Sequence, residues 1–173
     1  AEKALEASID DLGPRTLSIF PSQRKRGGIA SGFNPLVIKD AEALAKNKEH
    51  NWLIAPAMSG NRQIKYKNSN MNGEINGYLP VNFEVRGFDI GSGRLFSEKE
   101  NLGRKRVIVL GSKVPGELKT SAREILNKDI LIAGTSYTVI GILKEEGSTG
   151  WQNPDDDLYV PLLTAAQRIF GTD

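Results

Sequence analysis

Apolar residues recur at helical spacing in two stretches of the first third of the chain. Residues 2–12 repeat leucine or isoleucine every three or four positions and end at Gly13-Pro14, which predicts a short amphipathic helix. Alanine and leucine follow Asp40, so a second helix is predicted from Asp40 to Lys48. Between the helices, residues 15–20 alternate with period two and predict a strand, and the glycine- and arginine-rich stretch from Pro21 to Pro35 predicts a mobile basic loop.

The middle of the chain has the composition of a strand followed by a hairpin. Trp52 to Ala57 predicts a buried strand interrupted by Pro56. Gln63 to Lys67 alternates apolar and basic residues, as a half-exposed strand does. Asn70 to Gly73 supplies residues that tolerate positive φ, so the hairpin turn is predicted there, with Glu74 to Leu79 as the returning strand.

The second half contains the clearest strand patterns. Lys105 to Leu110 ends in four consecutive apolar residues, which predicts a strand covered on both faces. A short helix to about Lys119 is predicted next, followed by a hairpin of Ile130–Ala133 and Ser136–Leu143 with Gly134 in the turn. The remaining elements are predicted as a polar loop over 145–157, a strand at Leu158–Val160 and a helix at Thr164–Phe170. The fold class predicted from these elements is α+β.

Composition excludes several classes of protein. The 173 residues are 39% apolar and 25% charged, enough for a packed core and too apolar for a disordered chain. The formal net charge of +2 is too small for a dedicated nucleic-acid binder, and the absence of cysteine rules out a disulfide scaffold. No transmembrane segment is expected in this stretch, because no apolar run approaches 18 residues. The chain begins with Ala1 rather than Met, which is typical of an excised or processed piece.

Residue types that carry chemistry are sparse. The chain has one histidine, His50, and no cysteine, which argues against zinc and redox-metal sites. Ser112 follows Gly111 but lacks the second glycine of a nucleophile elbow. Gly91 to Gly93 is interpreted as a tight turn in preference to a phosphate-binding loop. Asp155 to Asp157 is a calcium candidate, although a solvated loop or helix cap is the favoured interpretation of this acidic run. We therefore expect no catalytic residues, no bound metal and no cofactor in this domain.

Two basic patches and one aromatic residue are candidates for partner contact. The patches Arg24-Lys25-Arg26 and Arg104-Lys105-Arg106 can meet acidic lipid headgroups, nucleic acid or an acidic protein, or simply face solvent. Neither patch has interleaved aromatic residues, which argues against binding of single-stranded nucleic acid. Trp151 lies in a glycine-rich polar loop, where it is either a partner anchor or a side chain folded back onto its own core. We select Arg24, Lys25, Arg26 and Trp151 as partner-interface candidates.

The order of the later segments resembles a known family. Residues 93–96, 106–111, 130–134, 137–143 and 157–171 look like the MacB-type periplasmic core domain of ABC transporter permeases of the MacB/FtsX-like class. The resemblance implies two lobes: a porter-like α/β lobe over residues 1–87 and a small β-rich lobe with a C-terminal helix over residues 88–173. Family members usually carry a further strand and helix after the position that matches Gly171, so the resemblance leaves two alternatives: a first lobe that lacks its C-terminal strand and helix, or a shorter relative of the family. Residues 120–127 depart from the family pattern.

The family resemblance also implies a function. It is that of an extracytoplasmic domain inserted between the first two transmembrane helices of a dimeric permease in the cell (inner) membrane, on the periplasmic or extracellular side. ATP would be hydrolysed in a separate cytoplasmic nucleotide-binding domain. The implied partners are the transmembrane and nucleotide-binding parts of the same transporter and an adaptor (membrane fusion protein), or a lipoprotein, peptide or macrolide cargo; nucleic acid is not among them.

Two alternatives remain open. One is an extracytoplasmic ligand-binding or sensor domain, which would use the turn from Phe88 to Gly93 or the Trp151 loop. The other, a hydrolase built on Ser112 and His50, is the weakest.

Overall fold

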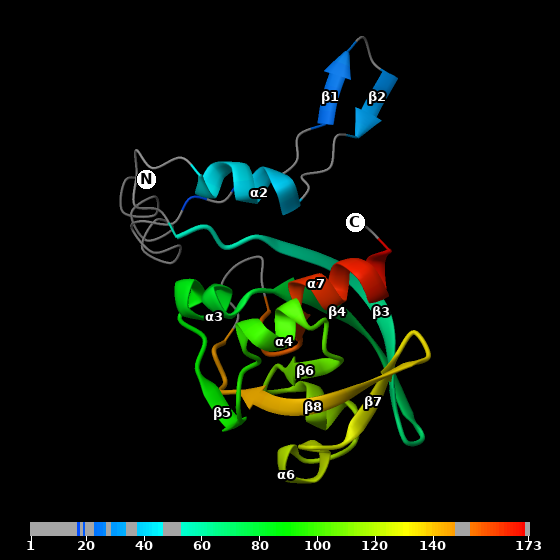
Figure 1. Cartoon of the computed structure of the whole chain (residues 1–173). Helices are drawn as coiled ribbons and strands as arrows, with labels where there is room; N and C mark the ends of the chain where they lie inside the picture. Colours follow the sequence, from blue (N-terminus) through cyan, green and yellow to red (C-terminus); the bar gives the residue numbers. More distant parts are fainter. Residues whose placement is uncertain are drawn as a thin grey trace, which may run out of the picture. The chain divides into compact units, whose positions relative to one another are not determined.

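The computed structural model divides the chain into two compact units, residues 1–54 and 55–173. It describes residues 17, 19, 23–26, 29–33, 38–46, 53–147 and 153–171. In the first unit, strands β1 (Gln23–Arg26) and β2 (Ile29–Phe33) pair antiparallel and helix α2 spans Ile38–Ala45 (Figure 1). The predicted helix over residues 2–12 lies outside the described residues, as does most of the predicted strand over residues 15–20.

Two predictions for the first unit can be compared with the structure. The helix predicted from Asp40 to Lys48 is confirmed as α2, which begins two residues earlier and ends three residues earlier. The prediction of a mobile loop from Pro21 to Pro35 is wrong, because β1 and β2 form a hairpin there. Antiparallel pairing satisfies backbone N–H and C=O groups whatever the side chains are, so a polar composition does not exclude strands.

The second unit is built on a sheet of seven strands. They are β3 (Ala57–Tyr66), β4 (Ser69–Tyr78), β5 (Ile90–Gly93), β6 (Val107–Leu110), β7 (Asp129–Ile132), β8 (Thr135–Leu143) and β9 (Leu158–Pro161). The order is β5-β8-β6-β9-β4-β3-β7, and β7 also pairs with β8. The strands β8, β6, β9, β4, β3 and β7 therefore form a closed ring, a small barrel to which β5 is added along the free part of β8 (Figure 1). The β4–β9 and β6–β8 pairs are parallel and the other pairs are antiparallel.

Side chains alternate between two hydrophobic clusters along the central strands. Ile108 and Leu110 of β6 join a largely aliphatic cluster that also contains Leu158 of β9. Val109, between Ile108 and Leu110, and Tyr159, which follows Leu158, join a second cluster rich in aromatic rings. All five side chains are at most 1% exposed. The period of two thus places β6 and β9 between two cores, and the prediction that β6 is covered on both faces is confirmed.

Short helices close the second unit. They are α3 (Pro80–Arg86), α4 (Glu98–Leu102), α5 (Val114–Glu117), α6 (Ala122–Ile125) and α7 (Leu162–Thr164), which continues into the π-helical segment η1 (Ala165–Phe170). Helix α4 begins at Ser97, whose hydroxyl accepts from the Glu100 N–H while the Glu100 carboxylate accepts from the Ser97 N–H. The C-terminal helix ends at Gly171, which has a φ of 66°. The predicted helix from Thr164 to Phe170 is confirmed, whereas α3, α4 and α6 were not predicted.

The two long hairpins test the predicted turns. Ala133 and Gly134 both take positive φ, 47° and 83°, and join β7 to β8 as predicted. The turn between β3 and β4 lies at Lys67-Asn68 instead of at residues 70–73, and Lys67 takes a φ of 51°. The strand predicted at residues 52–57 is also wrong for residues 53–56, which precede β3 without forming a strand. Pro56 has no N–H to donate to a ladder.

The boundary between the units differs from the predicted one at residue 87. Strand β4, before that position, pairs with β9 after it, and β3 pairs with β7. One sheet therefore contains strands from both sides of residue 87 in the sequence. The compact units divide between Ile54 and Ala55. None of the helices in the described part of the chain has the length and apolar character of a membrane span.

Candidate partner-binding loop

The four partner-interface candidates fall in different units. Arg24, Lys25 and Arg26 are consecutive residues of β1, in residues 1–54. Trp151 belongs to residues 55–173 and lies outside the described residues, but residues on both sides of it, up to Gly147 and from Asn153, are described. The three basic residues thus lie together on one strand. For the Trp151 segment, the contacts of the residues before and after it can be described.

The base of this loop converges on the carboxylate of Asp155, which is fully buried. One oxygen, Oδ1, accepts from the Glu146 N–H and from the Ser112 hydroxyl, both at 2.9 Å. The other oxygen, Oδ2, accepts from the Gly147 N–H at 3.1 Å and lies 3.5 Å from Lys113 Nζ. One carboxylate therefore joins the start of the loop, its end and the segment after β6.

The surroundings of Asp155 keep it ionised. Burial by itself would raise the pKa of Asp155, but hydrogen bonds from Glu146, Ser112 and Gly147, together with the charge of Lys113, hold its pKa below the ordinary value. A buried anion with several donors is stable as long as every donor stays in place. The arrangement accounts for Ser112 as a hydrogen-bond donor to this anchor.

Backbone contacts tighten the same region. The Gly111 N–H donates to the Asp157 carbonyl at 2.8 Å, and the Lys113 N–H donates to the Asp155 carbonyl at 2.9 Å. A Cβ on Gly111 would lie 2.4 Å from the Asp155 carbonyl oxygen, so this close approach requires glycine. The Tyr159 hydroxyl donates to the Pro154 carbonyl at 3.2 Å. The loop base is thus held by backbone hydrogen bonds to the segment directly after β6 and by the Tyr159 side chain of β9.

The three aspartates of the calcium candidate make different contacts. Asp155 accepts the hydrogen bonds at the loop base, and Asp156 accepts a hydrogen bond from the Asn153 side-chain amide. Burial, together with the charge of Glu74, raises the pKa of Asp157 to about 6. In the ranges that the structure describes, no three His, Cys, Asp or Glu side chains are grouped to hold a metal ion.

Gly91 and Gly93 lie in strand β5, which pairs antiparallel with β8. Gly93 takes a φ of 75°, and a Cβ there would lie 2.2 Å from the Ile140 carbonyl oxygen. The predicted need for positive φ is confirmed at Gly93, but the element is a strand end and not an isolated tight turn. His50 lies outside the described residues.

Two solved structures have the fold of this chain. The periplasmic region of MacB from Actinobacillus actinomycetemcomitans aligns with a TM-score of 0.75 at 22% identity, over 95% of this chain and 73% of that one. The extracellular domain of the noncanonic ABC-type transporter YknZ from Gram-positive bacteria aligns with a TM-score of 0.66 at 23% identity, over 79% of this chain and 67% of that one. The fold is therefore that of the extracytoplasmic domains of ABC-type transporters.

The chain belongs to the MacB-like periplasmic core domain family, whose model matches residues 1–173. It is 33% identical over 174 residues to the macrolide export ATP-binding/permease protein MacB of Bdellovibrio bacteriovorus and 29% identical over 172 residues to that of Neisseria gonorrhoeae. Each alignment covers 99% of this chain, but the chain spans 27% and 26% of the length of these relatives. The family resemblance found in the sequence is confirmed.

Proposed function

We propose that this chain is the extracytoplasmic domain of an inner-membrane ABC transporter permease and couples cytoplasmic ATP hydrolysis to efflux or to an adaptor or cargo in the periplasm. The observation that carries the proposal is the family match over residues 1–173. The proposal that ATP is hydrolysed outside this stretch is supported by two observations: the matched relatives are named macrolide export ATP-binding/permease proteins, and this chain spans only about a quarter of their length. In this proposal the domain itself binds no cofactor and catalyses no reaction.

The barrel unit suits a mechanical role. Its strands form a closed ring around an aliphatic cluster, and a closely packed interior resists compression and moves as a body. The loop base at Asp155 is joined by backbone hydrogen bonds to Gly111 and Lys113, directly after β6, and by the Tyr159 hydroxyl to β9. A displacement of the barrel would therefore carry the loop base with it, as coupling requires.

We assign partner contact to two surfaces, the Trp151 segment and the basic strand that carries Arg24, Lys25 and Arg26. Support for the first comes from the anchored base on either side of the segment, since a loop held at both ends loses less entropy on binding. Support for the second is its charge.

The test uses the full-length transporter, reconstituted with its adaptor, and compares adaptor-stimulated with basal ATPase rates. Trp151→Ala is expected to reduce the stimulation by about tenfold, the loss typical of an aromatic anchor, with the basal rate unchanged. Neutralisation of Arg24, Lys25 and Arg26 to serine is expected to reduce it by about threefold. The matched control is Arg123→Ser on α6, an exposed charge outside both surfaces.

The proposal is wrong if a permease that retains its membrane and nucleotide-binding parts but lacks this domain still exports its cargo at the normal rate. If coupling depends on the domain while both surface variants keep full stimulation, the domain's role stands and the placement of the contact surfaces is wrong.

A further inference from the structure

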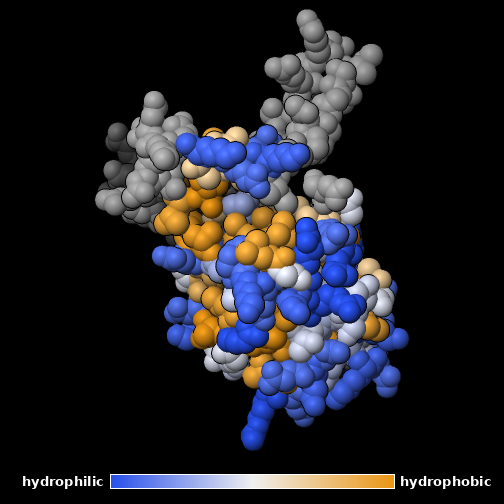
Figure 2. Space-filling model, in the orientation of Figure 1, coloured by the Kyte–Doolittle hydropathy of each residue, from blue (hydrophilic) through white to orange (hydrophobic). Residues whose placement is uncertain are grey.

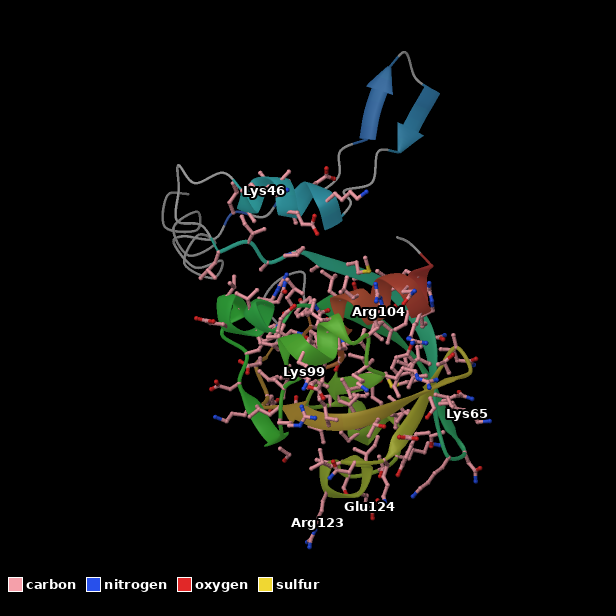
Figure 3. All side chains as sticks on the ribbon, in the orientation of Figure 1. Lys46, Lys65, Lys99, Arg104, Arg123 and Glu124 are labelled. Atoms are coloured by element: carbon pink, nitrogen blue, oxygen red, sulfur yellow. The ribbon has the colours of Figure 1, made fainter. Side chains whose placement is uncertain are left out.

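We propose that the barrel unit carries a second partner site, a basic band that binds an acidic polypeptide segment of another protein. The band is formed by five side chains, which come from β3, from the connection between α4 and β6, and from η1: Arg62, Arg104, Lys105, Arg106 and Arg168. Binding at this band does not depend on the proposed transport role. Figure 3 labels Arg104 beside α7, far from Arg123 on α6.

The first step places the connection after α4 against the C-terminal helix. The Leu163 N–H donates to Asn101 Oδ1 at 3.0 Å, and the Thr164 hydroxyl donates to the Lys105 carbonyl at 2.9 Å. Asn101 and Thr164 are buried, so these bonds fix the connection. Arg168 follows Thr164 by four residues, about one helical turn further along the same helix. The basic residues of the connection and Arg168 therefore lie on neighbouring elements.

The second step joins Arg106 to Arg168 through Tyr137. The Arg106 carbonyl accepts from the Thr138 N–H at 2.9 Å, which places Arg106 next to Tyr137 on β8. Burial raises the pKa of Tyr137, and the charges of Arg168 and Arg106 both oppose that rise. The Tyr137 hydroxyl is buried and has no hydrogen-bond partner among the described residues. The charges of both guanidinium groups thus act on the same unsatisfied hydroxyl.

Arg62 extends the band along the other side of η1. Its Nη2 donates to the Ile169 carbonyl at 3.1 Å, and its guanidinium carbon lies 4.7 Å from the centre of the Phe170 ring. This hydrogen bond and cation–π contact hold the guanidinium in place. In Figure 2, strongly hydrophilic surface lies right of centre, where Figure 1 shows the C-terminal helix.

None of the five side chains of the band forms an ion pair within the described part of the chain. Asp129, whose pKa is lowered mainly by hydrogen bonds from Thr138 and Ser136 and slightly by Arg106, already accepts from those two hydroxyls. Beside the band, Leu102 is 63% exposed. The surface thus offers several cations and one apolar contact.

These features favour a carboxylate-bearing protein over a membrane or nucleic acid. Guanidinium groups bind carboxylates in a bidentate geometry, and a guanidinium already held in place, like that of Arg62, loses little freedom on binding. Insertion into a lipid surface needs a broad apolar face, whereas Leu102 and Leu131 are the large exposed hydrophobic residues described in this unit. Binding of single-stranded nucleic acid needs exposed aromatic rings for stacking, and the described aromatic residues of this unit are buried or half-buried.

The test measures binding of the 173-residue chain to a fluorescein-labelled peptide of four Glu-Glu-Leu repeats by fluorescence anisotropy, at 50 and 300 mM salt. The peptide of four Gln-Gln-Leu repeats is the neutral control. We expect the acidic peptide to bind more tightly than the neutral one and to lose affinity at the higher salt concentration.

The decisive variant reverses three charges of the band: Arg104→Glu, Lys105→Glu and Arg168→Glu. It is expected to weaken binding of the acidic peptide by about tenfold or more, because attraction becomes repulsion at the contact. The unfolding midpoint of each variant is measured to show that the protein stays folded.

A second triple variant makes the same change of net charge around α6, with Lys119→Glu, Arg123→Glu and Lys128→Glu. All three residues are exposed. It is expected to weaken binding by less than about twofold. Equal weakening by the two variants, or equal affinity for the two peptides, would overturn the proposal. So would binding to phosphatidylglycerol vesicles without binding to the peptide, because the partner would then be a membrane.

Discussion

The interior of the barrel and the base of the Trp151 loop are both buried, but they are held by different forces. The interior is an aliphatic cluster that includes Ile64, Ile75 and Ile108, each 0% exposed. The loop base gathers around one ionised carboxylate, that of Asp155, with donors from three other residues. Dispersion and hydrophobic burial are spread over many side chains and do not depend on pH, whereas the polar base depends on one charge and its partners.

The difference separates the stability of the barrel from the position of the loop. Loss of one aliphatic side chain removes part of a large sum, and the whole barrel becomes less stable. Loss of the Asp155 charge leaves several donors without an acceptor in one place, so the effect is concentrated at the loop base. Substitutions in the two regions should therefore differ in the size of their effects on stability.

The largest effect is expected from a cavity in the barrel. Ile108→Ala should lower the free energy of unfolding by about 3 kcal/mol, measured by urea denaturation, because the side chain is fully buried in the aliphatic cluster. The control, Leu102→Ala, removes a side chain that is 63% exposed and should change stability by less than about 0.5 kcal/mol. Equal effects from the two substitutions would contradict the assigned core.

Removal of the charge at the loop base should have the next largest effect. Asp155→Asn keeps the shape but points an NH₂ group at donors, so we expect a loss of about 2 kcal/mol in the same urea experiment. Asp89→Asn is the matched control, since that carboxylate is exposed and lies 3.4 Å from Lys144 Nζ. A loss at Asp155 no larger than at Asp89 would show that the buried carboxylate does not hold the loop.

A partly exposed ion pair should contribute less. The Arg94 guanidinium donates two 2.8 Å hydrogen bonds to Glu100 and lowers the pKa of Glu100 from 4.5 to about 2. The stabilisation is therefore complete above pH 4.5 and is lost as the pH falls toward 2. Glu100→Gln should lower stability by about 1 kcal/mol at pH 7 and by almost nothing at pH 2. The control, Glu84→Gln, replaces an exposed residue of α3 and should change stability by less than about 0.5 kcal/mol at pH 7.

The smallest effect should be a gain in stability. The pKa of Asp157 is raised from 3.8 to about 6 by burial and by Glu74, so the ionised form is unfavourable in the fold. The contribution of Asp157 to stability should then decrease as the pH rises from 3.8 through 6. Asp157→Asn should be more stable than the wild type by about 1 kcal/mol at pH 7.5 and equally stable below pH 4, measured as unfolding midpoints. Identical midpoints at pH 7.5 would contradict the raised pKa.

Strong local patterns were enough to predict part of the barrel. Four consecutive apolar residues predicted β6 with both faces covered, and glycine between two apolar runs predicted the turn at Ala133-Gly134. The family, too, followed from the order of such segments. These features depend on neighbouring residues in the sequence, which is the information that a single chain provides.

Contacts between distant segments could not be predicted. Gly73 resembled a turn residue, but it lies in β4, where a Cβ would be 2.8 Å from a methyl carbon of Leu158. Asp155 and Ser112 are 43 residues apart and meet because β6 pairs with β9. The basic patch Arg104–Arg106 was recognised from the sequence, but the addition of Arg62 and Arg168 depends on how η1 contacts β3 and how α7 contacts the connection before β6.

Amide hydrogen exchange of the wild type and of Asp155→Asn distinguishes the barrel from the loop base residue by residue. We expect faster exchange in the variant at Glu146 and Gly147, whose N–H groups bind that carboxylate, and little change along β6, β8 and β9. Equally faster exchange in those strands, or unchanged exchange at Glu146 and Gly147, would contradict this distinction.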